Sequence, residues 1–71
     1  MSDEVKRMAD LARDDGTAAD TALRRLRGRL DDMAAVQTGI PKEHLLNASE
    51  ETTKILARVF KAQEHLRKAF Q

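Results

Sequence analysis

The chain has 71 residues, of which 35% are charged, and it contains no cysteine, tryptophan or tyrosine. Thirteen Lys and Arg against twelve Asp and Glu give a formal net charge of +1, which excludes a global field that would draw the chain to nucleic acid or acidic membranes. Chains this short without disulfides or a metal usually gain stability from a partner chain. We therefore expect a single domain over residues 1–71 that associates with itself or with another protein, and we expect no cofactor.

The N-terminal residues open with acidic side chains and have no apolar run behind them, so we expect no secretory signal. No stretch approaches the roughly 20 apolar residues that a membrane span requires. We therefore expect a cytoplasmic protein with no membrane span.

The first half of the chain carries a heptad pattern, which predicts a helix that packs along another helix. One set of positions, seven residues apart, is Val5, Ala12, Ala19, Leu26, Met33 and Ile40. The alternate set is Ala9, Gly16, Leu23, Leu30 and Gln37. The pattern is weak in its early part, where the residues are small, and strong from Leu23 to Met33.

Gly16 divides two interpretations of this half. Glycine inside a helix costs about 1 kcal/mol relative to alanine, and Thr17 could cap a new helix together with Asp20. We predict a break here, with a short helix or extension near 3–14 and a longer helix near 18–38. The heptad phase runs through Gly16 unbroken, so a single long helix stays open.

Gly39 and Pro41 predict a tight turn between two helices. Glycine suits the position just past a helix end because it adopts a left-handed conformation freely, and proline suits the first turn of a helix. A second heptad pattern follows at Leu45, Ala48, Thr52, Ile55, Val59, Ala62, Leu66 and Ala69. It predicts a helix near 42–70, which could instead restart near residue 48, since Asn47 and Glu50 match a capping box.

The predicted second helix is apolar over about half of its circumference, because Leu46, Leu56 and Phe60 lie beside its heptad stripe. The first helix shows a narrower stripe. One neighbouring helix cannot cover so wide a face, so either residues 3–14 fold back as a third helix or a second chain docks there.

The chain carries three groups of polar residues that could form sites. The basic run over 24–29 could bind phosphate, but Asp20 and Asp31 stand at ion-pair spacing from Arg24 and Arg27, and no aromatic side chain is near for a base to stack on. We therefore favour a solvated, ion-paired face over nucleic-acid contact.

The two Glu-His pairs, Glu43-His44 and Glu64-His65, lack the spacing of bundle metal sites, because adjacent residues point about 100° apart on a helix. We expect no metal site. The two serines, Ser2 and Ser49, look like helix caps, and the heptad positions hold no charged residue for catalysis. We expect a protein that is not an enzyme.

The layout resembles the small co-chaperones of bacterial type III secretion needle subunits. The resemblance is carried by Asp15-Gly16-Thr17, by the heptad leucines Leu23, Leu26 and Leu30, and by the Gly39-Ile40-Pro41 turn. It implies a helical hairpin that pairs with a tetratricopeptide-type chaperone, so that the two hold the needle subunit in the cytosol. It also implies that Val5, Met8 and Leu11 contact the chaperone, with the wide face of the second helix as the other candidate surface.

Together these features predict an all-α protein, an antiparallel helical hairpin with helices near 18–38 and 42–70. The predicted function is a non-enzymatic protein-binding module, a co-chaperone or adaptor for a secretion subunit. The predicted partner-binding residues are Val5, Met8, Leu11, Leu46, Leu56 and Phe60. The alternative is a homodimeric four-helix bundle with a structural or regulatory role, including an RNA-binding version through Arg24–Arg29.

Overall fold

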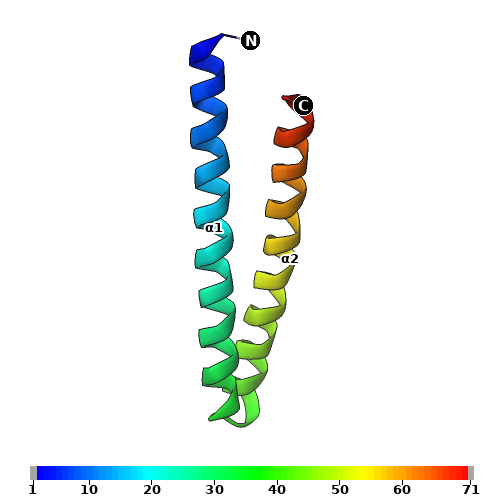
Figure 1. Cartoon of the computed structure of the whole chain (residues 1–71). Helices are drawn as coiled ribbons and strands as arrows, with labels where there is room; N and C mark the ends of the chain where they lie inside the picture. The colour runs from blue at the N-terminus through cyan, green and yellow to red at the C-terminus, as the bar shows by residue number, and fades with distance from the viewer. Residues whose placement is uncertain (1, 71) are drawn as a thin grey trace.

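The computed structural model describes residues 2–70 and shows two long antiparallel helices joined by a short turn (Figure 1). α1 spans Asp3–Ala35 and α2 spans Gly39–Ala69. The chain is elongated, with a radius of gyration of 16.4 Å, against about 11 Å for a compact domain of this length. The predicted all-α helical hairpin is confirmed.

The N-terminus of α1 is capped as the sequence predicts. The Ser2 side chain accepts a hydrogen bond from the backbone N–H of Val5 at 3.2 Å, which satisfies one of the N–H groups that a helix start leaves free. Asp3 and Glu4 lie in the first turn, where negative charge is favourable to the helix dipole. The first turns of α1 project beyond the end of α2 (Figure 1).

The predicted break at Gly16 is wrong, because α1 runs through it as one helix. The Thr17 hydroxyl donates to the backbone carbonyl of Arg13 at 3.1 Å inside the helix, and so does not cap a new one. Gly16 is instead a point of close approach to α2, since a Cβ built there would lie 2.6 Å from Nε2 of Gln63. Residues 3–14 therefore do not form a separate or third helix.

The turn lies where the sequence predicts, but its bounds differ: α1 ends at Ala35 rather than near residue 38, and Gly39 is the first residue of α2 rather than the residue just past α1. Gly39 has φ +66°, the left-handed conformation that glycine favours. Pro41 lies in the first turn of α2, where its missing N–H costs no helical hydrogen bond. α2 then continues without interruption past Asn47 and Glu50, so the restart near residue 48 does not occur.

The contact between the helices is narrow and partly polar. Ala9 and Ala34 of α1 are buried, and so are Ser49, Thr52 and Leu56 of α2. Among residues 2–70 no large side chain is completely buried. The chain therefore lacks the enclosed core that usually stabilises a domain.

The helices are rotated relative to the predicted packing. Leu26, Met33 and Ile55, which the heptad pattern places in the contact, are 46%, 51% and 46% exposed. Leu23 and Leu30, at the alternate heptad positions, do face α2. Their neighbours around the helix also face the contact. On α1 these half-buried neighbours are Asp20 and Arg27, and on α2 they are Gln63 and Glu64.

Polar side chains hold part of this contact together. The Ser49 hydroxyl donates to Oδ1 of Asp31 across the interface at 2.6 Å, so Ser49 is not the helix cap that the sequence suggests. The Thr52 hydroxyl donates to the backbone carbonyl of Ala48 at 2.9 Å, which satisfies it within its own helix. The hairpin thus buries a strip of mixed polarity and leaves Leu26, Met33 and Ile55 about half exposed beside it.

Neither α1 nor α2 contains an apolar stretch of the length and purity that crossing a bilayer requires.

Candidate protein-binding surface

The two helices enclose a groove on each side of the hairpin, and the two grooves differ in chemistry. On one side the groove is lined mainly by small and aliphatic residues from both helices: Ala12, Asp15, Gly16, Ala19, Val59, Ala62, Gln63 and Leu66. We call this side the alanine face. On the other side the lining is Asp20, Arg24, Arg27, Thr53, Leu56, Ala57, Phe60, Lys61 and Glu64. We call that side the arginine face.

The alanine face continues along the whole hairpin with larger apolar side chains. Residues seven apart on a packed helix share a face. Leu26 and Met33 follow Ala19 at this spacing, and Ile55 precedes Ala62. All three are about half exposed. These three side chains, which the heptad pattern predicts to be core, are therefore exposed on the alanine face.

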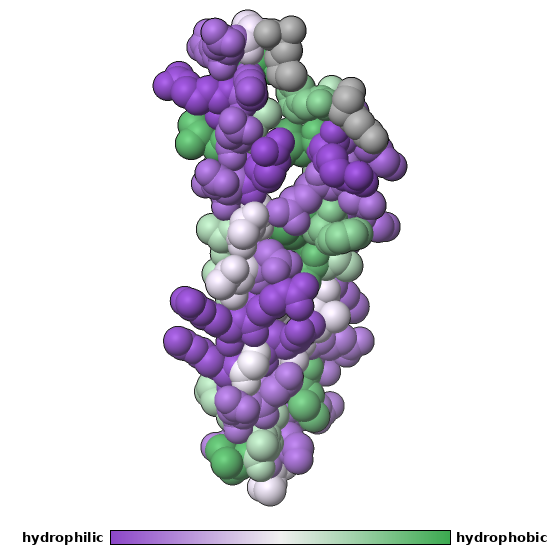
Figure 2. Space-filling view, in the orientation of Figure 1, coloured by the Kyte–Doolittle hydropathy of each residue, from purple (hydrophilic) through white to green (hydrophobic). Residues whose placement is uncertain are grey.

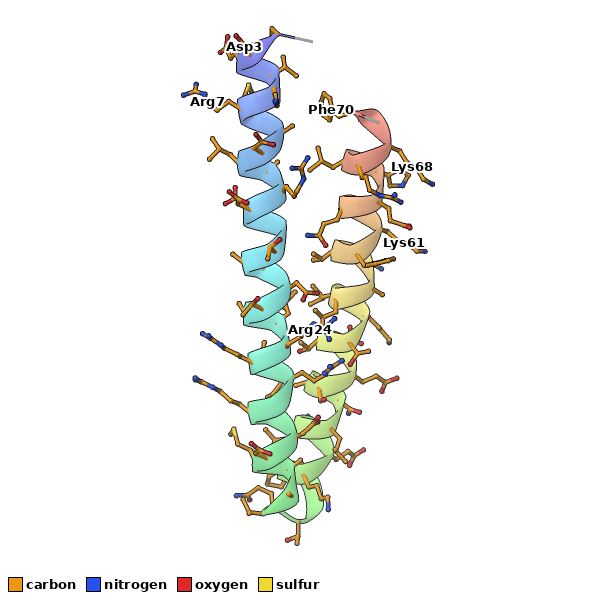
Figure 3. All side chains as sticks on the ribbon, viewed as in Figure 1. Asp3, Arg7, Arg24, Lys61, Lys68 and Phe70 are labelled. Atoms are coloured by element: carbon orange, nitrogen blue, oxygen red, sulfur yellow. The ribbon has the colours of Figure 1, made fainter. Side chains whose placement is uncertain are left out.

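The arginine face is charged and locally ion-paired. Nε of Arg24 lies 2.8 Å from Oδ2 of Asp20, and this hydrogen bond together with the carboxylate charge raises the pKa of Arg24. Arg24 appears between the two helices in Figure 3, and the surface seen from the same side in Figure 2 is mainly hydrophilic. Phe60, 61% exposed, is the main apolar side chain there.

The six predicted partner-binding residues do not form one surface. Val5 and Met8 lie seven residues before Ala12 and Asp15, so they extend the alanine face toward the N-terminus. Leu11 is 57% exposed but is not among the residues that line the grooves.

The three predicted residues of α2 lie elsewhere. Phe60 lines the arginine face, and Leu46, two heptads before it, lies on the same side of α2. Leu56 is only 7% exposed and packs against α1. Because it is already covered within the hairpin, it is not available to a partner while the two helices stay together.

Sequence reasoning missed Leu26, Met33 and Ile55 as surface residues because it assigned them to the contact between the two helices. Heptad periodicity identifies an apolar stripe, but it does not state whether the stripe faces the neighbouring helix of the same chain or another chain.

The basic run does not form a continuous basic patch. The predicted pairing of Arg24 with Asp20 is confirmed. The predicted pairing of Arg27 with Asp31 is not among the ion pairs of residues 2–70, and Asp31 instead accepts the hydroxyl of Ser49.

No three His, Cys, Asp or Glu side chains in the described part of the chain lie close enough to hold a metal ion. Comparison with protein-family models, with curated proteins and with solved structures finds no match to this chain.

Proposed function

We propose that this chain is a non-enzymatic protein-binding module that docks the alanine face onto helices of a protein. The observation that carries the proposal is the exposure of the heptad residues Leu26, Met33 and Ile55 on that face. A helix pair with an apolar strip left outside is incomplete by itself, because exposed apolar surface gains free energy when another helix covers it.

The surface area of the chain supports the same proposal. The solvent-accessible area is 5711 Å², whereas a folded monomer of 8.0 kDa exposes about 4,450 Å². The excess of roughly 1,250 Å² exceeds the ~800 Å² that each partner buries in a standard protein–protein interface. This excess area is therefore large enough for an interface of standard size.

In its specific form, we propose a cytoplasmic co-chaperone or adaptor, in line with the resemblance to the hairpin partners of secretion needle subunits. A hairpin that shields an aggregation-prone helix needs an exposed apolar face and charged flanks that keep it dissolved. The alanine face and the arginine face are suited to these two tasks. The RNA-binding alternative gains no comparable support, since Arg24 is held by Asp20.

The proposal is tested by co-purification from cells that express the tagged chain after chemical crosslinking. The double variant Leu26→Glu, Ile55→Glu places charges in the alanine face, at two side chains that are each 46% exposed in the hairpin. We expect the amount of crosslinked protein recovered with this variant to be at least tenfold lower than with the wild-type chain. The reason is that a buried unpaired carboxylate costs several kcal/mol.

The matched control is the double variant Leu46→Glu, Phe60→Glu, which adds the same charge on the opposite side. It should retain the crosslinked protein. Equal recovery with the wild type and both variants would contradict the proposed function.

A further inference from the structure

We propose that a second copy of this chain covers the alanine face, so that two hairpins form a four-helix bundle. In this bundle α1 of each copy lies antiparallel to α2 of the other. The inference rests on the proposed function, because it names the chain that occupies the alanine face when no helix of another protein is bound there. Two features carry it: the apolar content of the face and the placement of charges along its edges.

The apolar content of the face is self-complementary. α1 contributes Leu26 and Met33 after Ala12 and Ala19, and α2 contributes Ile55 with an alanine seven residues on either side. A two-fold axis along the bundle would place the larger side chains of one copy beside the same strip of the other, as in coiled-coil packing. The excess surface of the single hairpin is of the size that such a symmetric interface buries.

The edges of the alanine face carry charges at regular positions. On α1, Arg29 lies between Leu26 and Met33, three residues after the first and four before the second. On α2, Glu51 lies in the same way between Ala48 and Ile55. Residues at these positions flank the apolar strip and meet their equivalents across an antiparallel interface.

The register of the hairpin sets which charges would meet. Gly16 lies against Gln63, and Asp31 contacts Ser49. Between these two contacts, Arg29 lies at the level of Glu51 along the long axis. With the two-fold axis parallel to the helices, α1 faces the other copy's α2 at the same level, so Arg29 meets Glu51 of the second copy.

A second pair of edge residues fits the same arrangement. Asp15 lines the groove of the alanine face, and the register places it near the level of His65. His65 lies three residues after Ala62 and four before Ala69, at the edge of the strip. In the bundle the Asp15 carboxylate would face an imidazole of the second copy, which can donate a hydrogen bond to it.

The other symmetric arrangement, with α1 against α1 of the second copy, is less favourable. Pairing Asp15 with Arg29 of the second copy would put the two-fold axis near Ala22. Arg58 lies close to that level on α2, so the Arg58 side chains of the two copies would approach each other. Like charges side by side across an interface disfavour that pairing, whereas the antiparallel α1–α2 arrangement places Arg58 near Ala22.

The ion pairs already present within the chain leave these residues available. Glu51 is paired with Lys54 at 3.2 Å, but both side chains are more than half exposed, and such pairs contribute little. Arg29 is exposed, and no ion pair of residues 2–70 includes it. Docking of a second copy would therefore break no strong interaction.

Sedimentation equilibrium over a concentration series tests the proposal with four proteins: the wild-type chain, Arg29→Glu, Glu51→Arg and the double variant with both changes. We expect a wild-type mass of twice 8.0 kDa. Each single charge reversal should raise the dissociation constant about tenfold, since two like-charged contacts arise per dimer. The double variant restores opposite charges and should return to within about twofold of wild type.

Lys61→Glu on the arginine face is the matched control, since it makes the same change of charge away from the interface. It should leave the dissociation constant unchanged. Single reversals without effect, or a double variant that stays as weak as the singles, would overturn the proposal. Rescue of Arg29→Glu by Asp15→Arg would overturn the α1–α2 arrangement in favour of α1 against α1.

A monomeric wild-type chain would also overturn the inference, and it is distinguishable from failure of the proposed function. If the chain is monomeric while Leu26→Glu, Ile55→Glu still removes a crosslinked protein, the alanine face binds a different chain and only the second copy is excluded. If that variant removes nothing, the protein-binding function itself fails.

Discussion

The Ser49 side chain of α2 forms a hydrogen bond with α1. It is 8% exposed, and its hydroxyl donates to a carboxylate oxygen of Asp31 at 2.6 Å. Hydrogen bonds to charged groups contribute more than neutral ones. Because Asp31 is exposed to water, its loss of this donor leaves no buried charge, so the contribution is moderate.

We therefore expect Ser49→Ala to lower the free energy of unfolding by about 1 kcal/mol, measured by urea denaturation at fixed protein concentration. Thr53→Ala is the matched control, because the Thr53 hydroxyl donates to a backbone carbonyl of its own helix and alanine favours helix. It should change stability by less than about 0.5 kcal/mol. Equal effects of the two substitutions would show that the bond to Asp31 contributes nothing.

At this scale the sequence predicts local contacts well and contacts between helices poorly. The Ser2 cap, the Asp20–Arg24 pair and the left-handed Gly39 each depend on residues within four positions of one another, and each is present. The roles of Ser49 and Leu56 depend on the rotation of one helix against the other. Local spacing does not contain that rotation.

The helices themselves are continuous, although glycine occurs inside α1. Gly16 and Gly28 both lie within Asp3–Ala35. Sequence propensity treats the two alike, but only Gly16 was predicted to break the helix, because a potential cap follows it. The helix runs through both glycines, and at Gly16 the missing side chain leaves room for the close approach of Gln63.

Gly28 and Gly39 predict opposite outcomes on substitution. A Cβ at Gly28 would meet nothing within 4 Å, so Gly28→Ala should stabilise α1 by about 1 kcal/mol through helix propensity. Gly39→Ala should destabilise the hairpin by about 1 kcal/mol, since alanine is strained at the observed φ of +66°.

The urea midpoints of these two variants at equal concentration, compared with wild type, check both signs. An unchanged midpoint for Gly39→Ala would contradict the left-handed turn. A lowered midpoint for Gly28→Ala would mean that another chain packs closely against that position.

The whole molecule is a pair of helices without an enclosed core among residues 2–70. The predicted hairpin topology and turn are correct, because they follow from heptads on either side of Gly39 and Pro41. The predicted helix-to-helix contact is only partly correct, because two amphipathic helices can pack on either edge of a broad stripe. This hairpin uses the edge with Ser49, Leu56 and Gln63, and so leaves Leu26, Met33 and Ile55 exposed on the other edge.

We predict that a second copy of the chain covers the alanine face in solution and leaves the arginine face exposed. The chain has no cysteine, so single-cysteine variants report each face by their rate of labelling with a thiol reagent. Ile55→Cys and Leu46→Cys are matched, since these residues lie on the same helix and are 46% and 47% exposed in the single hairpin.

The labelling rates of the two variants, measured under reducing conditions over a concentration series, show which face a second copy covers. Ile55→Cys should react progressively more slowly as concentration rises, at least tenfold more slowly once the two-copy bundle forms, while Leu46→Cys keeps the same rate throughout. Equal rates at every concentration, or protection of Leu46→Cys alone, would mean that no second copy covers the alanine face.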